Sequence, residues 1–216
     1  TDVAGFDADV QQGRFTFFGE IAGSSHAAFA GLMGTIVELG REALMTFVYR
    51  DYSPCFNSLH ANGFGENGDT NNERGLYVAW TLPVGRKGRV SLFFDQFKYP
   101  WRTLFNPLPV SGHDVVLQAE TAASEKPSLS FRLQKRTTEY TAADHDVSGR
   151  DTKFIVDRSR WRCRLIATTR PHPHLHCRTL LEAPIVEFAL PRRKERGFLV
   201  SQELLYRVSP ALSIGV

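Results

Sequence analysis

The sequence predicts an all-β protein, an antiparallel up-and-down meander forming a transmembrane β-barrel of the outer-membrane type, with about ten to eleven strands visible. Three observations lead to this fold class. Charged and apolar residues alternate strictly along several segments, long and short connections alternate, and several strand-like runs approach ten residues. A strand tilted by about 45° needs roughly ten residues to cross the hydrocarbon layer, whereas an average globular strand is about half as long.

The clearest alternation lies between residues 156 and 167. Here Arg158, Arg160, Arg162 and Arg164 occupy one set of positions, and Trp161, Cys163, Leu165 and Ala167 occupy the other. A helix turns by about 100° per residue and would spread both sets around its circumference. A strand points successive side chains to opposite faces, so this segment is predicted to be a strand with one basic face and one apolar face.

Other segments follow in chain order with the same or a looser pattern. Clean alternation occurs at residues 14–21, 76–82, 114–120, 129–134 and 198–207. Strand-like composition with less regular alternation occurs at residues 27–37, 43–52, 90–99 and 174–187, and residues 211–216 look like the start of a further strand. No convincing amphipathic helix competes with these segments, so residues 1–216 are predicted to form one β domain.

The connections between these segments alternate in length. Residues 53–74, 100–110 and 141–153 are long connections, whereas residues 83–88, 122–127 and 170–173 are short. Residues 188–197 are intermediate and residues 209–210 are tight. Since neighbouring strands are antiparallel, all long connections fall at one end, as in outer-membrane barrels with short periplasmic turns and longer external loops.

Aromatic residues cluster where the strands meet the long connections. Rings at one level resemble the interfacial girdle of a membrane barrel, and we expect that role for Tyr49, Tyr52, Tyr77, Phe97, Tyr99, Trp101, Tyr140 and Phe154.

Composition narrows the possible classes. The net charge of +3 is too mild to indicate a nucleic-acid binder, and no apolar run is long enough for a transmembrane helix. The three cysteines form no spaced motif, and Cys163 and Cys177 lie on apolar alternations, as small buried hydrophobic residues do. The chain starts without a recognisable secretion signal, so any such signal is expected outside this sequence.

In a barrel, the polar alternation faces the lumen. This rule predicts lumen-lining roles for Arg132, Arg136, Arg158, Arg160, Arg162, Arg164 and Arg178, and for Glu20, Asp95, Asp114, Glu120, Glu182 and Glu203. A basic wall opposite an acidic wall would favour anionic solutes. Alternatively, these charges pair across neighbouring strands and merely fill a narrow lumen.

Other chemistry is weakly indicated. His172, His174 and His176 are weak metal-ligand candidates in a proline-rich turn, and residues 62–72, with Glu66 and Asp69, have the oxygen-rich composition of a calcium loop without its spacing. His113 and Asp114 point to opposite faces of a strand and cannot orient one another. We therefore expect no catalytic residues, no cofactor and no enzymatic activity.

Two stretches resemble a known family. These are SLHANGFGE at 58–66, continuing through NNERGLY at 71–77, and SLFFDQFKYPW at 91–101. They are similar to an uncharacterised family of outer-membrane β-barrel proteins from Bacteroidetes- and Chlorobi-type bacteria, some of which carry an upstream helix-hairpin-helix segment. The resemblance implies a bacterial outer-membrane location but no substrate or catalytic residues. In such proteins the barrel continues past the position of Val216, so the chain is expected to be a fragment of a larger barrel.

Three functions stay open at this point. The first is a porin-like or transport-associated barrel in contact with the lipid bilayer and small anionic solutes. The second is a closed structural or anchoring barrel whose external loops, 53–74 and 141–153, bind an envelope protein or a glycan. The third is a soluble β-sandwich that acts as a binding module.

Overall fold

The predicted antiparallel up-and-down meander is confirmed. The computed structural model describes residues 2–24, 28–40, 42–58, 61–66, 68–121, 127–145, 151–209 and 212–215, and these contain strands and no helix. Thirteen strands form one sheet, in which twelve follow each other in chain order and β11 pairs with β10 beside this path. The strands are β1 (Val3–Gln12), β2 (Phe15–Ser24), β3 (Phe29–Gly40), β4 (Ala43–Tyr52), β5 (Glu73–Val84), β6 (Gly88–Tyr99), β7 (Val110–Thr121), β8 (Ser128–His145), β9 (Asp151–His172), β10 (Leu175–Phe188), β11 (Arg193–Arg196), β12 (Leu199–Ser209) and β13 (Leu212–Gly215).

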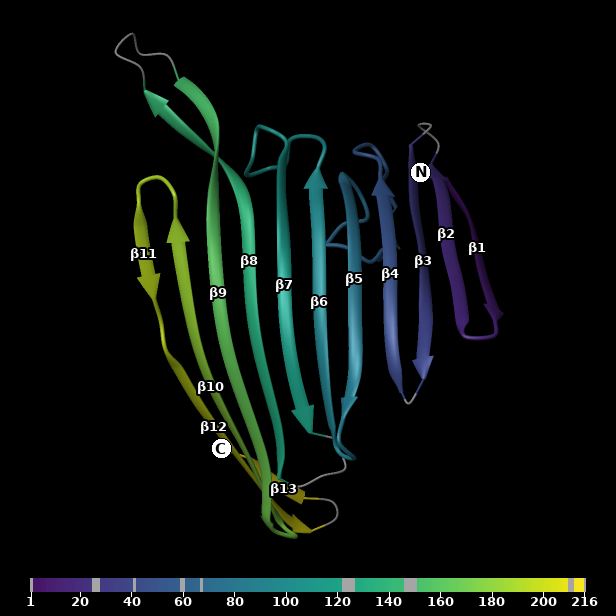
Figure 1. The fold of residues 1–216 in the computed structure, drawn as a ribbon. Helices are drawn as coiled ribbons and strands as arrows, with labels where there is room; N and C mark the ends of the chain where they lie inside the picture. Colours follow the sequence, from purple (N-terminus) through teal and green to yellow (C-terminus); the bar gives the residue numbers. More distant parts are fainter. Residues whose placement is uncertain are drawn as a thin grey trace.

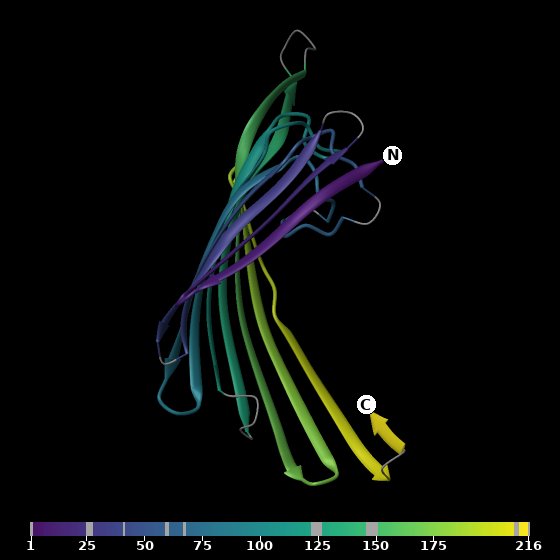
Figure 2. The ribbon, with the colours of Figure 1, turned by 90° about the vertical axis from the view of Figure 1, so that its right-hand side faces the viewer.

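The sheet is a single curved and twisted layer (Figures 1 and 2). It is open, since β1 and β13 lie at its two edges and do not pair with each other. One layer is not the pair of packed sheets that a β-sandwich requires, so the described residues lack that architecture. Within the same residues, no helix is long and apolar enough to span a membrane.

The two faces of the sheet differ in chemistry, although the convex face also carries charged residues, among them Asp51, Arg74, Lys98, Lys135 and Asp157. The loop between β4 and β5 lies on the concave side (Figure 2), against side chains such as Arg50 and Tyr77. Strand pairing puts directly opposite residues on one face, so the register assigns each alternation to the concave or the convex side. The convex face carries exposed large apolar side chains over most strands: Phe6, Val10, Phe15, Phe17, Ile21, Phe29, Met33, Tyr49, Leu76, Leu82, Val84, Leu92, Leu117, Leu129, Ile155, Trp161, Val200, Leu204 and Tyr206.

Large concave side chains lie across glycines of the next strand at three places. The directly paired residues are Phe18 and Gly34, Arg50 and Gly75, and Phe97 and Gly112. A Cβ atom added at any of these glycines would come within 2.4 to 2.5 Å of the side chain opposite. Only a glycine leaves room for such a side chain to lie flat over the neighbouring strand.

The structure adds two strands that were not predicted. β1 does alternate Phe6, Ala8 and Val10 with polar residues, so its sequence carried a usable signal. β11 has four residues, all charged, within the connection predicted at 188–197. Such a short edge strand is defined by its pairing with β10 rather than by periodicity.

Candidate functional site on the concave face

The connection between β4 and β5 folds over the concave face. We call residues 53–72 the inner loop, of which 53–58, 61–66 and 68–72 are described. Phe64 contacts the sheet from this loop, with its ring edge-on to Tyr77 at 5.0 Å and 5.4 Å from the guanidinium carbon of Arg50. The Tyr52 hydroxyl donates a hydrogen bond of 2.9 Å to the Phe64 carbonyl. The loop is thereby fastened to β4 and β5.

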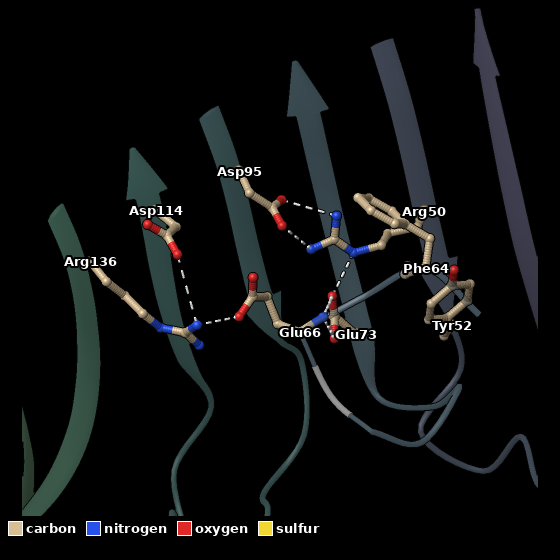
Figure 3. A network of polar contacts seen from close by, with 8 residues as sticks. All are labelled: Arg50, Tyr52, Phe64, Glu66, Glu73, Asp95, Asp114 and Arg136. Carbon is tan, nitrogen blue, oxygen red and sulfur yellow. Dashed lines mark hydrogen bonds and ion pairs between the residues drawn. The ribbon is translucent and has the colours of Figure 1, made fainter. Parts of the chain in front are cut away.

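Arg50 is the centre of a buried ion network under this loop (Figure 3). Its side chain and that of Glu73 are both 0% exposed. Arg50 Nε donates to Glu73 Oε1 at 2.5 Å, and its two terminal nitrogens donate to the two Asp95 oxygens at 3.0 Å each. The three residues come from β4, β5 and β6, and Gly75 leaves the space in which the guanidinium lies. Bidentate pairing of this kind fixes geometry as well as charge.

Glu66 extends the network toward β7 and β8. Its carboxylate lies 2.5 Å from Arg136 Nη1, which is 4.0 Å from Asp114 (Figure 3). Gln134 donates to Asp114 at 2.5 Å. The Glu66 backbone N–H donates to both oxygens of Glu73 at 3.0 Å. Burial raises the pKa of the Glu66 carboxyl, and the nearby Arg136 only partly offsets this effect. The inner loop therefore links five strands through charged groups.

Asn72, at the end of the inner loop, joins it to the connection between β6 and β7. Its side-chain oxygen accepts from the Trp101 N–H at 2.8 Å, and its side-chain nitrogen donates to the Trp101 carbonyl at 3.0 Å. Asn72 has φ of 50°, a left-handed conformation that asparagine tolerates better than most residues. The two loops are thus held together at one end of the sheet.

The predicted lumen-lining residues all lie on the concave alternation. Several form ion pairs with neighbouring strands: Arg164 and Glu182 at 2.6 Å, Arg162 and Glu182 at 3.2 Å, Arg178 and Glu203 at 3.6 Å, and Arg89 with Glu120. Arg132, Arg158 and Arg160 form no ion pair with the described residues. Cross-strand pairing, one of the two expected arrangements, therefore accounts for part of the set.

Charge is unevenly distributed across the concave face. In β1–β3 the charged concave residues are acidic: Asp7, Asp9, Glu20 and Glu38. In β8 and β9 the charged concave residues with described side chains and a paired register position are arginines: Arg132, Arg136, Arg158, Arg160, Arg162 and Arg164. Between them, the buried network of Arg50 combines both signs. The face thus has an acidic side and a basic side.

The aromatic girdle prediction is wrong for most of its members. Tyr52, Tyr77, Phe97, Tyr99, Tyr140 and Phe154 lie on the concave alternation, where Tyr52 and Phe97 are each 3% exposed. The rings therefore point to the charged side of the sheet, and two of them, Tyr52 and Tyr77, contact Phe64 of the inner loop. Only Tyr49 lies on the convex alternation, and Trp101 is an exposed loop residue.

Sequence patterns missed the two fully buried members of the network, Arg50 and Glu73. Arg50 was visible as a lone arginine on the polar alternation of residues 43–52, and Glu73 ends a long polar loop. Their partnership depends on the pairing of β4 with β5, which brings residues 23 positions apart into contact. Periodicity within single segments cannot reveal it.

The weak metal candidates do not form a metal centre in the described part of the chain. The His172 and His174 rings lie 5.5 Å apart, but no group of three or more His, Cys, Asp or Glu side chains among the described residues is placed to hold an ion. In the calcium-like segment, Glu66 pairs with Arg136. His113 and Asp114 lie on opposite faces, and Ser111 donates to Glu139 at 2.8 Å.

Comparisons of the chain with protein-family models, with curated proteins and with solved structures find no match.

Proposed function

We propose that this chain forms part of the wall of a bacterial outer-membrane β-barrel, with its concave face lining an aqueous passage for small anionic solutes. The observation that carries the proposal is the contrast between the faces of a single curved sheet. Soluble monomers rarely expose contiguous apolar patches larger than a few hundred Å², whereas a barrel wall presents such a surface to lipid and keeps charges inside.

The concave face supports the choice of a passage. Arginines without carboxylate partners among the described residues gather on β8 and β9, and a one-sign surface raises the local concentration of the opposite ion. The inner loop projects from the wall at one end and carries Glu66 against Arg136. A charged constriction of this kind is a usual source of ion selectivity.

Conductance of the purified protein in a planar bilayer tests the proposal. Under a KCl gradient, we expect a reversal potential that indicates anion preference. The double charge reversal R158E/R160E should shift the preference toward cations, because both side chains lie on the concave face. The matched control K98E reverses an exposed charge on the convex face and should leave selectivity unchanged. Absence of conductance, or cation preference of the unmodified protein, contradicts the proposal.

A second candidate is an anchoring barrel whose external loop binds an envelope protein. It is favoured by the connection between β6 and β7, where Leu104 and Phe105 are 89% and 85% exposed. The variant L104S/F105S should then lose cross-linking to that protein in intact cells while its bilayer conductance is unchanged. Equal cross-linking before and after the substitution contradicts this candidate.

A further inference from the structure

A pocket opens on the concave face beside Arg158 and Arg160 of β9, the first two of the four alternating arginines Arg158 to Arg164, which we call the arginine ladder. It has a volume of about 290 Å³ and lies at the loop end of β6 to β9. Its lining includes Tyr99, Arg136, Thr138, Arg158 and Arg160. The space suffices for a small polar molecule, although not for a polymer.

In this pocket, hydrogen-bond donors without a partner outnumber acceptors without a partner. The guanidinium groups of Arg158 and Arg160 and the hydroxyls of Thr138 and Tyr99 have no hydrogen-bond or ion-pair partner among the described residues. Arginine is a donor only, whereas each hydroxyl can donate or accept. The pocket therefore offers guanidinium donors without acceptors, together with two hydroxyls that can add a donor each.

The carboxylate and the amide oxygen of the lining residues are not available to a ligand in the pocket. Glu139 lies on the convex alternation, where its carboxylate accepts from the Ser111 N–H at 2.7 Å and from the Ser111 hydroxyl at 2.8 Å. Asn106 Oδ1 accepts from the Thr141 N–H at 3.0 Å. A ligand that complements the pocket must bring its own acceptors and negative charge.

Strand register crowds positive charge at this point. Arg136 is directly opposite Arg160, and Arg158 lies two positions along β9 on the same face. Like charges directly opposite each other destabilise a sheet. Further along β9, Glu182 pairs with Arg162 and Arg164 and thereby reduces the repulsion between arginines. At the pocket, Glu66 pairs with Arg136 alone.

We infer that this pocket binds a tetrahedral oxyanion of the phosphate type, either free inorganic phosphate or the phosphate group of a small phosphomonoester. Guanidinium groups match the oxygens of phosphate in pairs, and the hydroxyls donate to the remaining oxygens. The inference rests on the proposed function only for the route by which such a solute reaches the pocket. The binding itself follows from the donors described above.

Equilibrium dialysis of the detergent-solubilised protein with radiolabelled inorganic phosphate, at constant ionic strength, tests the inference. We expect saturable binding that sulfate displaces and chloride does not. The variant R158Q/R160Q should weaken binding at least about tenfold, since each lost charge-assisted pair is worth more than a neutral hydrogen bond. The matched control R89Q removes a concave arginine that pairs with Glu120, away from the pocket, and should bind phosphate as the unmodified protein does.

The outcomes separate this site from the proposed passage. No saturable phosphate binding, or equal weakening in R158Q/R160Q and R89Q, overturns the site, even if the protein conducts. Phosphate binding that depends on Arg158 and Arg160 supports the site, even if no conductance is found. Competition by a sugar phosphomonoester at lower concentration than free phosphate identifies the ester as the preferred source. Far-UV circular dichroism of each variant verifies that the sheet has formed.

Discussion

Replacing Arg50 by methionine should be among the most damaging single changes in the described part of the chain. Arg50 compensates two carboxylates at once, those of Glu73 and Asp95, through contacts of 2.5 Å and twice 3.0 Å. Methionine retains the apolar stem but leaves both acids buried without this cation. Removing one partner of a buried ion pair costs about 3–5 kcal/mol, and we expect a loss in the upper part of that range.

Urea unfolding in phospholipid vesicles, followed by tryptophan fluorescence, measures this loss. With a denaturant slope of about 2–3 kcal/mol per molar, a loss of about 4–5 kcal/mol lowers the midpoint by about 1.3–2.5 M. The control R89M removes an arginine whose side chain is 60% exposed and should cost less than about 1 kcal/mol.

The triple variant R50M/E73Q/D95N separates lost charge balance from lost packing. Removing all three charges together should recover most of the stability, because neutral groups of similar shape can replace a buried ion network at little cost. If R50M loses no more than R89M, or if the triple variant is less stable than R50M, the network does not act as a charge-balanced unit.

Three further predictions concern the glycine contacts, the two faces and the inner loop. The substitution G112A should destabilise the protein by about 1–3 kcal/mol, since the added Cβ would lie 2.5 Å from the Phe97 ring. The control G23A adds a Cβ with nothing within 4 Å and should change the free energy of unfolding by less than about 0.5 kcal/mol. Urea titration compares the two variants, and equal effects would contradict the contact. In vesicles, L117R on the convex face should cost about 2–4 kcal/mol, and Q118R on the concave face should cost clearly less; equal folded yields would argue against a lipid-facing convex side. Because burial raises the pKa of Glu66 above its ordinary value of 4.5, the native state holds this proton more tightly than the unfolded state does. The corresponding stability is fully present below pH 4.5 and is lost as the pH rises through the raised pKa, and E66Q should remove this slope from a plot of unfolding midpoint against pH.

Sequence periodicity predicted the meander and the chemistry of both faces. The two-residue repeat of strands is local, so Arg158 to Arg164 could be assigned to one face without knowledge of their neighbours. The antiparallel order of the strands follows from the same alternation and is confirmed. The predicted long connection at residues 141–153 is wrong, because β8 extends to His145 and β9 begins at Asp151, which leaves a connection shorter than the one between β7 and β8. What periodicity cannot predict is the direction in which a long loop folds.

That direction explains the main differences between prediction and structure. The inner loop turns onto the concave face because Phe64 and Glu66 find partners on β4, β5 and β8, and these contacts span separate segments of the sequence. Two of the aromatic residues predicted for the girdle, Tyr52 and Tyr77, contact Phe64 of this loop and lie on the concave side. Arg50 could be recognised as central only once β4, β5 and β6 had been aligned.

The register between neighbouring strands is determined by two kinds of feature: tight turns in some pairs, and the glycines beneath Phe18, Arg50 and Phe97 in the others. Short turns near Gly13, Gly40 and Gly85 set the register of β1–β2, β3–β4 and β5–β6, because a short turn fixes which residues face each other. Each glycine contact lies in one of the intervening pairs, β2–β3, β4–β5 and β6–β7, whose strands are joined at the other end of the sheet. A slip of one residue there would drive a large side chain into a Cβ atom and would turn the charged alternation of that strand toward the convex side. From β1 to β7, every neighbouring pair of strands thus has one feature that determines its register, either a tight turn or a glycine contact. The inner loop can therefore vary in length without changing the register of the sheet.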